Sequence, residues 1–222
     1  MSKQLERVLP ILTTIPGVNI PATLLQGIYI AASQRKMEQF EGALRYEVNL
    51  LNRKIEAGKL RLDREYIKSD AFAANVVQAL RAAEVAESEN KLHFIARALV
   101  GCSLSFSEPR LDRSQTLRII EGMSEREMTV FVTYFKILDS INLELGLIPL
   151  DTQISVEGLS RQEFISALLG IEQLGLLTKE NLSDREGEWV DTPRHSGPGF
   201  AWKLTGLARQ VANLSRFGGD DI

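Results

Sequence analysis

Side chains that could carry acid–base or nucleophilic chemistry are scarce in this chain of 222 residues. Only two histidines are present, His93 and His195, although histidine is the residue that most often performs general acid–base catalysis. His93 stands between Leu92 and Phe94 on an amphipathic stretch, so we expect it to be a partly buried packing residue. The histidine content therefore gives little support to an enzyme.

The segment Gly101-Cys-Ser-Leu-Ser has part of the pattern of a nucleophile elbow. It lacks the second glycine and the preceding strand that place the nucleophile on a sharp turn. Cys102 is the single cysteine, so it cannot form an internal disulfide. Its apolar context predicts a small buried hydrophobe in a reducing compartment.

Neither a metal site nor a phosphate-bearing cofactor is predicted. Cysteine and histidine do not cluster at metal-ligand spacing, and neither common glycine-rich phosphate loop occurs. Glu84, Glu87 and Glu89 have helical spacing and are interpreted as a solvated face. We therefore expect a non-enzymatic protein without a cofactor.

Hydrophobic periodicity predicts that the chain is helical to about residue 140. A long amphipathic stretch runs from Ala22 to about Glu56. Shorter helices follow, because Ser and Asp side chains that can cap a helix recur ahead of apolar periodic segments. These helices are expected to begin at 69 or 70, near 88, at 111 and at 124, and the last two to end near 121 and 138.

The C-terminal third shows the clearest order of elements. Ser160 and Glu163 form a capping box, which predicts a helix start, and Gly175 fits the left-handed residue that ends a helix. Strands are expected at 176–181 and 200–205, with a last helix over 206–216. The capped helix carries a wide apolar stripe of Phe164, Ile165, Leu168, Leu169, Ile171 and Leu174. We expect Leu168 and Leu169 to be core residues.

This region resembles the winged-helix superfamily. The residues that carry the resemblance are Leu174-Gly175-Leu176-Leu177 at the helix end and Leu204-Thr205-Gly206-Leu207-Ala208 further on. The resemblance implies that the helix from Ser124 is the first of the module, with a short second helix or turn at 154–159 and the capped helix third. The connection 142–152 is expected to hold a strand or a turn.

In a winged helix the third helix usually enters the major groove of DNA. By position, the resemblance implies a set of contacts on the third helix and the wing: Ser160, Arg161, Gln162, Ser166, Arg185, Arg194 and His195. Charge argues against DNA, because from residue 151 onward seven Lys or Arg stand against eleven Asp or Glu, whereas DNA affinity depends on neutralised phosphates.

The whole chain also resembles uncharacterised bacterial and mobile-element proteins, some suspected in phage defence, through its broken apolar start and Gln34-Arg35.

The N-terminal segment has no charged residue from Val8 to Gln34. Pro10, Pro16 and Pro21 interrupt it, so it lacks the roughly 20 consecutive apolar residues of a spanning helix. We interpret it as a bent apolar arm that packs on the body or a partner. Contact of residues 8–33 with a membrane surface is the alternative.

The sequence thus predicts a mainly α protein with a helical N-terminal domain and a winged-helix-like C-terminal module carrying a small β-hairpin wing. The expected boundaries are an apolar arm at 1–33, a helical domain at 34–121, the winged module at 122–217 and a tail at 218–222. The expected function is protein binding or homo-oligomerisation by a cytoplasmic regulatory or adaptor protein of a bacterial defence or mobile-element system. The first alternative is a winged-helix DNA-binding transcriptional regulator. The second alternative is a membrane-associated effector that uses the apolar arm.

Overall fold

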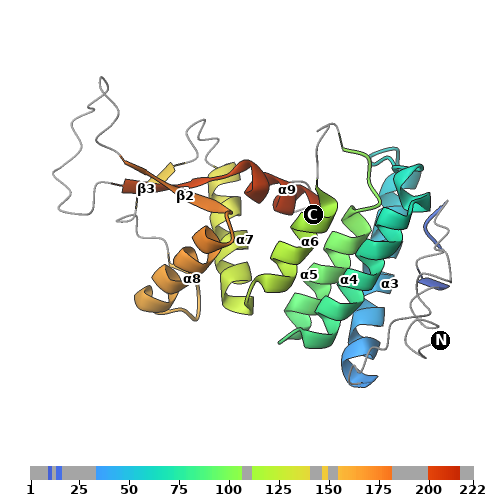
Figure 1. The fold of residues 1–222 in the computed structure, drawn as a ribbon, viewed down its shortest axis with the longest axis horizontal. Helices are drawn as coiled ribbons and strands as arrows, with labels where there is room; N and C mark the ends of the chain where they lie inside the picture. The colour runs from blue at the N-terminus through green and yellow to red at the C-terminus, as the bar shows by residue number, and fades with distance from the viewer. Residues whose placement is uncertain are drawn as a thin grey trace. The chain divides into compact units, whose positions relative to one another are not determined.

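The computed structural model describes residues 10–11, 14–16, 34–106, 112–140, 147–149, 155–181 and 200–215. The chain divides into two compact units, one of residues 1–125 with 213–216 and the other of residues 126–212 with 217–222. Helices dominate both, and a small antiparallel sheet lies in the second (Figure 1). The predicted fold class, a helical domain followed by a module with a small hairpin, is confirmed.

The first unit is built around one central helix. Its described elements are α3 (Gln34–Glu56), the 3-10 helix η1 (Tyr66–Lys68), α4 (Asp70–Val85), α5 (Glu89–Gly101) and α6 (Arg113–Gly122). Helix α5 lies against α3, α4 and α6 (Figure 1). It is accordingly buried around most of its circumference, at Lys91, Leu92, Phe94, Ile95, Ala96, Ala98, Leu99, Val100 and Gly101.

Local capping explains where these helices begin. Ser69 Oγ accepts a hydrogen bond from Phe72 N, and Ser88 Oγ accepts one from Lys91 N, which confirms both predicted starts. Helix α6 begins at Arg113 rather than at residue 111, because Asp112 caps it by accepting from Gln115 N at 2.8 Å. The predicted long helix is described from Gln34 onward, and its first part lies outside the described residues.

Two buried charged residues, Lys91 of α5 and Glu47 of α3, join α5 to its neighbours. Lys91 Nζ donates to Glu121 O at 2.9 Å and to Met123 O at 2.6 Å, and so satisfies carbonyls at the end of α6 that have no intrahelical donor. Arg97 Nε lies 3.1 Å from the buried Glu47 carboxylate of α3. Each contact joins segments distant in sequence, and together they hold α5 to α3 and to the end of α6.

The second unit holds α7 (Glu125–Ser140, from Arg126 onward), β1 (Leu147–Pro149), α8 (Arg161–Gln173), β2 (Leu177–Asn181), β3 (Phe200–Leu204) and most of α9 (Gly206–Ser215). The sheet has the order β1-β3-β2 with both pairs antiparallel. Helix α8 lies beside β2. The predicted 142–152 connection contains β1. The 154–159 segment is described from residue 155, and it has a turn at residues 157 and 158, one of the two predicted alternatives.

The predicted ends of α8 are confirmed. Both hydrogen bonds of the Ser160–Glu163 capping box are present, and Gly175 follows the helix with φ 76°. One prediction for the helix is wrong: Leu168 is 1% exposed, whereas Leu169 is 41% exposed. Leu169 lies about 100° further round the helix than Leu168, which takes it away from the side occupied by the buried Phe164, Ala167 and Ile171.

The N-terminal arm is described at residues 10–11 and 14–16 only. Ile11 and Ile15 are buried there, and the remaining arm residues lie outside the described part. Among the helices that are described, none is long and apolar enough to cross a bilayer.

Candidate functional site

The predicted α8 contacts lie at the start of that helix, but two of them make local interactions. Ser160 is the helix cap, with its backbone N 3.0 Å from Glu163 Oε2. The guanidinium of Arg161 lies 5.5 Å from the centre of the Phe164 ring. Gln162 and Ser166 are exposed. The predicted wing residues Arg185, Arg194 and His195 lie outside the described residues.

The start of α8 already holds an anion, the carboxylate of Glu163. Glu163 lies 2.9 Å from Arg126 Nη2 of α7. Hydrogen bonds from the backbone and side chain of Ser160, with the Arg126 charge, hold the pKa of Glu163 below its usual value. Arg161 is the single basic residue of α8. The charge of Arg126 and the backbone amide of Ser160 at this helix start are engaged by Glu163, a residue of the protein itself.

The exposed side of α8 is an uncharged row of residues, which we name the α8 stripe: Gln162, Ser166, Leu169 and Gln173. Their spacing of four, three and four residues places them on one face of the helix. The opposite face is buried through Phe164, Ala167, Leu168 and Ile171. An exposed leucine therefore stands within a neutral row on a helix whose other face is anchored in the core.

A polar cluster of the first unit, which we name the Arg113 network, joins η1, α4 and α6. Arg113 Nη2 donates to Asp63 Oδ2 at 2.8 Å and to Leu104 O at 2.9 Å, and its guanidinium lies 3.7 Å from the centre of the Tyr66 ring. The buried Asn75 donates its amide to the Tyr66 hydroxyl. Sequence reasoning missed this cluster because its members are far apart in the chain.

Two ionisable side chains in this region, Tyr66 of the Arg113 network and the buried Cys102, have raised pKa values. Burial raises the pKa of Tyr66 to about 12, and burial also raises the pKa of Cys102 to about 12. Both groups are therefore protonated near neutral pH, when a nucleophile or base would need to be ionised. The prediction that Cys102 is a buried hydrophobe is confirmed by its full burial.

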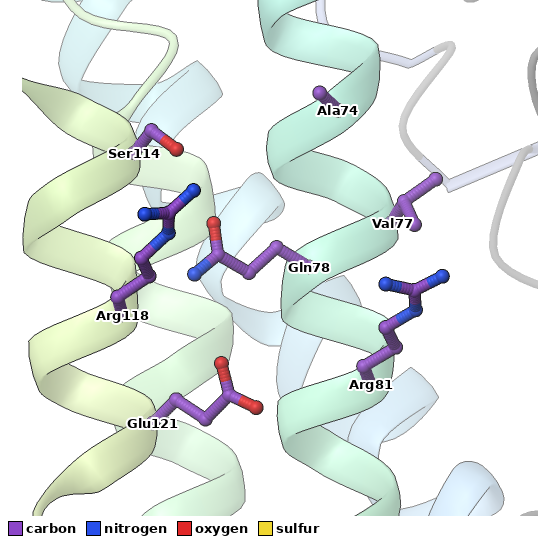
Figure 2. Close-up of a pocket in the computed structure, with 7 residues that line it drawn as sticks. All are labelled: Ala74, Val77, Gln78, Arg81, Ser114, Arg118 and Glu121. Atoms are coloured by element: carbon purple, nitrogen blue, oxygen red, sulfur yellow. The ribbon is translucent and has the colours of Figure 1, made fainter.

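A groove between α4 and α6 was also missed. It has a volume of about 520 Å³ and is lined by Ala74, Val77, Gln78, Arg81, Ser114, Arg118 and Glu121. Figure 2 shows Gln78 and Glu121 reaching toward the opposite helix and Arg118 rising toward Ser114. The lining residues recur at three- and four-residue spacing on each helix, but the sequence does not reveal that the two helices are neighbours.

Comparison with protein-family models, curated proteins and solved structures finds no match to this chain. Within the ranges that the structure describes, no three His, Cys, Asp or Glu side chains are grouped to hold a metal ion. The winged-helix resemblance therefore stays a prediction.

Proposed function

We propose that this is a non-enzymatic regulatory or adaptor protein that binds through the α8 stripe, first of all to a second copy of itself. The observation that carries the proposal is Leu169, which is 41% exposed amid the neutral Gln162, Ser166 and Gln173. Interface cores are depleted in charge relative to the rest of a protein surface. A helix with one buried face presents such a stripe on a rigid support.

The spacing of the stripe favours self-association. Residues 162, 166, 169 and 173 follow the intervals four, three and four, which read the same in both directions. Two antiparallel copies of α8 would therefore oppose Gln162 to Gln173 and Ser166 to Leu169, as an isologous twofold contact requires. One helix face buries little area, so the association is expected to be weak and transient.

DNA binding is the second candidate, and the charges on the described part of α8 weigh against it. Specific and non-specific DNA affinity both draw on Lys and Arg that neutralise phosphates. On α8 the single arginine, Arg161, lies near the Phe164 ring, and Arg126 of α7 pairs with Glu163. The region from residue 151 onward has four more acidic than basic residues.

A membrane-peripheral effector is the third candidate. It would use the apolar arm, but Ile11 and Ile15, two described arm residues, are buried on the protein. The resemblance to bacterial and mobile-element proteins adds a bacterial defence system as the proposed setting for the binding activity.

Fluorescence anisotropy of labelled duplex DNA with the full-length protein separates the first two candidates. We expect no saturable binding at physiological salt within the range of roughly 10⁻⁴ to 10⁻⁶ M that non-specific DNA binders reach. Salt-sensitive binding that is lost in Arg161→Ala and Gln162→Ala would establish the DNA reader instead. Ser114→Ala, in the other unit, is the control variant.

A further inference from the structure

The α4–α6 groove is lined by polar side chains that do not bond to one another in the described part of the chain. In the described part of the chain, the side chains of Gln78, Arg81, Ser114, Arg118 and Glu121 form no hydrogen bond or ion pair with another residue. Other charged residues of the same unit do pair, as Arg113 does with Asp63 and Arg97 with Glu47. Five polar groups around one groove are thus available to a partner.

The shape of the groove suits an extended ligand. Its lining residues span residues 74–81 on α4 and 114–121 on α6, a length of about 10 Å at 1.5 Å per residue. Two turns of a helix have that length. Helix α5 packs on both α4 and α6, so a further helix over the groove would extend the bundle by the same packing.

The groove has apolar residues on one helix and charged residues on both helices. Ala74 and Val77 supply an apolar strip on α4, and Arg81 lies beside them on that helix (Figure 2). Arg118 stands on α6, one turn before Glu121 (Figure 2). Guanidinium groups bind carboxylates in a bidentate manner, while the apolar strip favours an aliphatic face.

We propose that the α4–α6 groove binds an acidic amphipathic helix from a partner protein. The aliphatic face of that helix packs on Ala74 and Val77, and flanking carboxylates pair with Arg81 and Arg118. Glu121 lies at the same end of the groove as Arg81 (Figure 2), so it repels a carboxylate on the α6 side there and favours one on the α4 side, beside Arg81. This is the helix-in-groove mode of recognition with added charge selection.

Other ligands fit the groove less well. A free phosphate would contact two exposed arginines without covering the apolar strip, so most of the groove would stay empty. A nucleic acid would place its phosphates against Glu121 and find only two cations, whereas phosphate contacts supply most of its affinity. The mixture of apolar strip, two arginines and one glutamate is selective for a peptide.

The test uses the full-length protein and a synthetic capped peptide of about four helical turns, with leucines on one face and glutamates on both flanks. A matched peptide carries Lys in place of every Glu. Titration is followed by anisotropy of a dye on the peptide, at low ionic strength because exposed ion pairs are screened by salt. We expect saturable binding of the Glu peptide and at least tenfold weaker binding of the Lys peptide.

Charge reversal locates the site. Arg81→Glu with Arg118→Glu should weaken the Glu peptide about tenfold or more and strengthen the Lys peptide, while Arg64→Glu, at another exposed arginine of the same unit, should change neither. Far-ultraviolet circular dichroism checks that each variant is folded.

Three outcomes would overturn the proposal. They are the absence of saturable Glu-peptide binding, an equal loss in Arg64→Glu, and displacement of the peptide by millimolar sodium phosphate at constant ionic strength, which would indicate a small-anion site.

Discussion

Arg113 Nη2 lies 2.8 Å from Asp63 Oδ2, and this ion pair joins residues fifty positions apart in the chain. The same nitrogen also donates to Leu104 O, and the guanidinium covers the Tyr66 ring. The connection between α3 and α4 is therefore held to the start of α6 by one side chain. Because the Arg113 side chain is only 10% exposed, water can only partly replace its hydrogen bonds to Asp63 and Leu104 when the side chain is removed.

Arg113→Ala should lower the free energy of unfolding by about 1.5–3 kcal/mol, the range for hydrogen bonds to charged groups. The loss leaves Asp63 and the Leu104 carbonyl without their donor. Urea denaturation followed by circular dichroism measures it. Arg118→Ala, one and a half turns further along α6 and exposed, should stay within about 0.5 kcal/mol, and an equal loss in both variants would contradict the role given to Arg113.

The Asp63 carboxyl should make the free energy of unfolding depend on pH in the acidic range. Burial acts to raise the pKa of Asp63, but hydrogen bonds from Arg113 and from the backbone amides of Tyr66 and Glu65 outweigh it, so the pKa falls below the usual 3.8. A carboxyl whose pKa is lower in the folded state adds stability above its unfolded pKa and loses it as the pH falls through the folded value.

The wild type should therefore lose more stability than Asp63→Asn when the pH falls below 3.8. Urea titrations at neutral pH and at successive values below this point measure the two slopes. At neutral pH the variant should be the less stable of the two. Parallel curves for both proteins would show that Asp63 does not carry the effect.

Features set by neighbouring residues could be predicted from the sequence, and features set by packing could not. Ser69, Ser88 and Ser160 cap their helices as expected, because a cap needs only the next three residues. The exposure of Leu169 depends on which side of α8 meets the core. Arg81 and Arg118 look like ordinary solvated residues until α4 and α6 are seen to adjoin.

Leu168 and Leu169 should respond oppositely to truncation. Leu168→Ala should cost about 2–5 kcal/mol, as expected for a buried leucine, because its side chain is 1% exposed. Leu169→Ala should change the free energy of unfolding by less than about 0.5 kcal/mol, as exposed substitutions usually do. Thermal or urea melts at low protein concentration measure both, and a large loss at Leu169 would place it in the core after all.

Gly101 should not tolerate a side chain. A Cβ built there overlaps the backbone carbonyl of Leu214, in the turn of α9 that belongs to the first unit. Gly101→Ala should therefore cost about 1–3 kcal/mol, the range for overpacking. Gly42→Ala in α3, where a Cβ meets nothing within 4 Å, should instead stabilise by about 0.5–1 kcal/mol. Urea melts that show a gain for both variants would contradict the close approach.

Sedimentation velocity of the full-length protein over a series of concentrations tests the α8 stripe as a self-binding surface. We expect the weight-average sedimentation coefficient of the wild type to rise with concentration and that of Leu169→Glu to stay at the monomer value. Tyr46→Glu, at an exposed aromatic residue of α3, should behave like the wild type. A wild-type coefficient that does not rise with concentration, or a rise that survives in Leu169→Glu, would contradict the account.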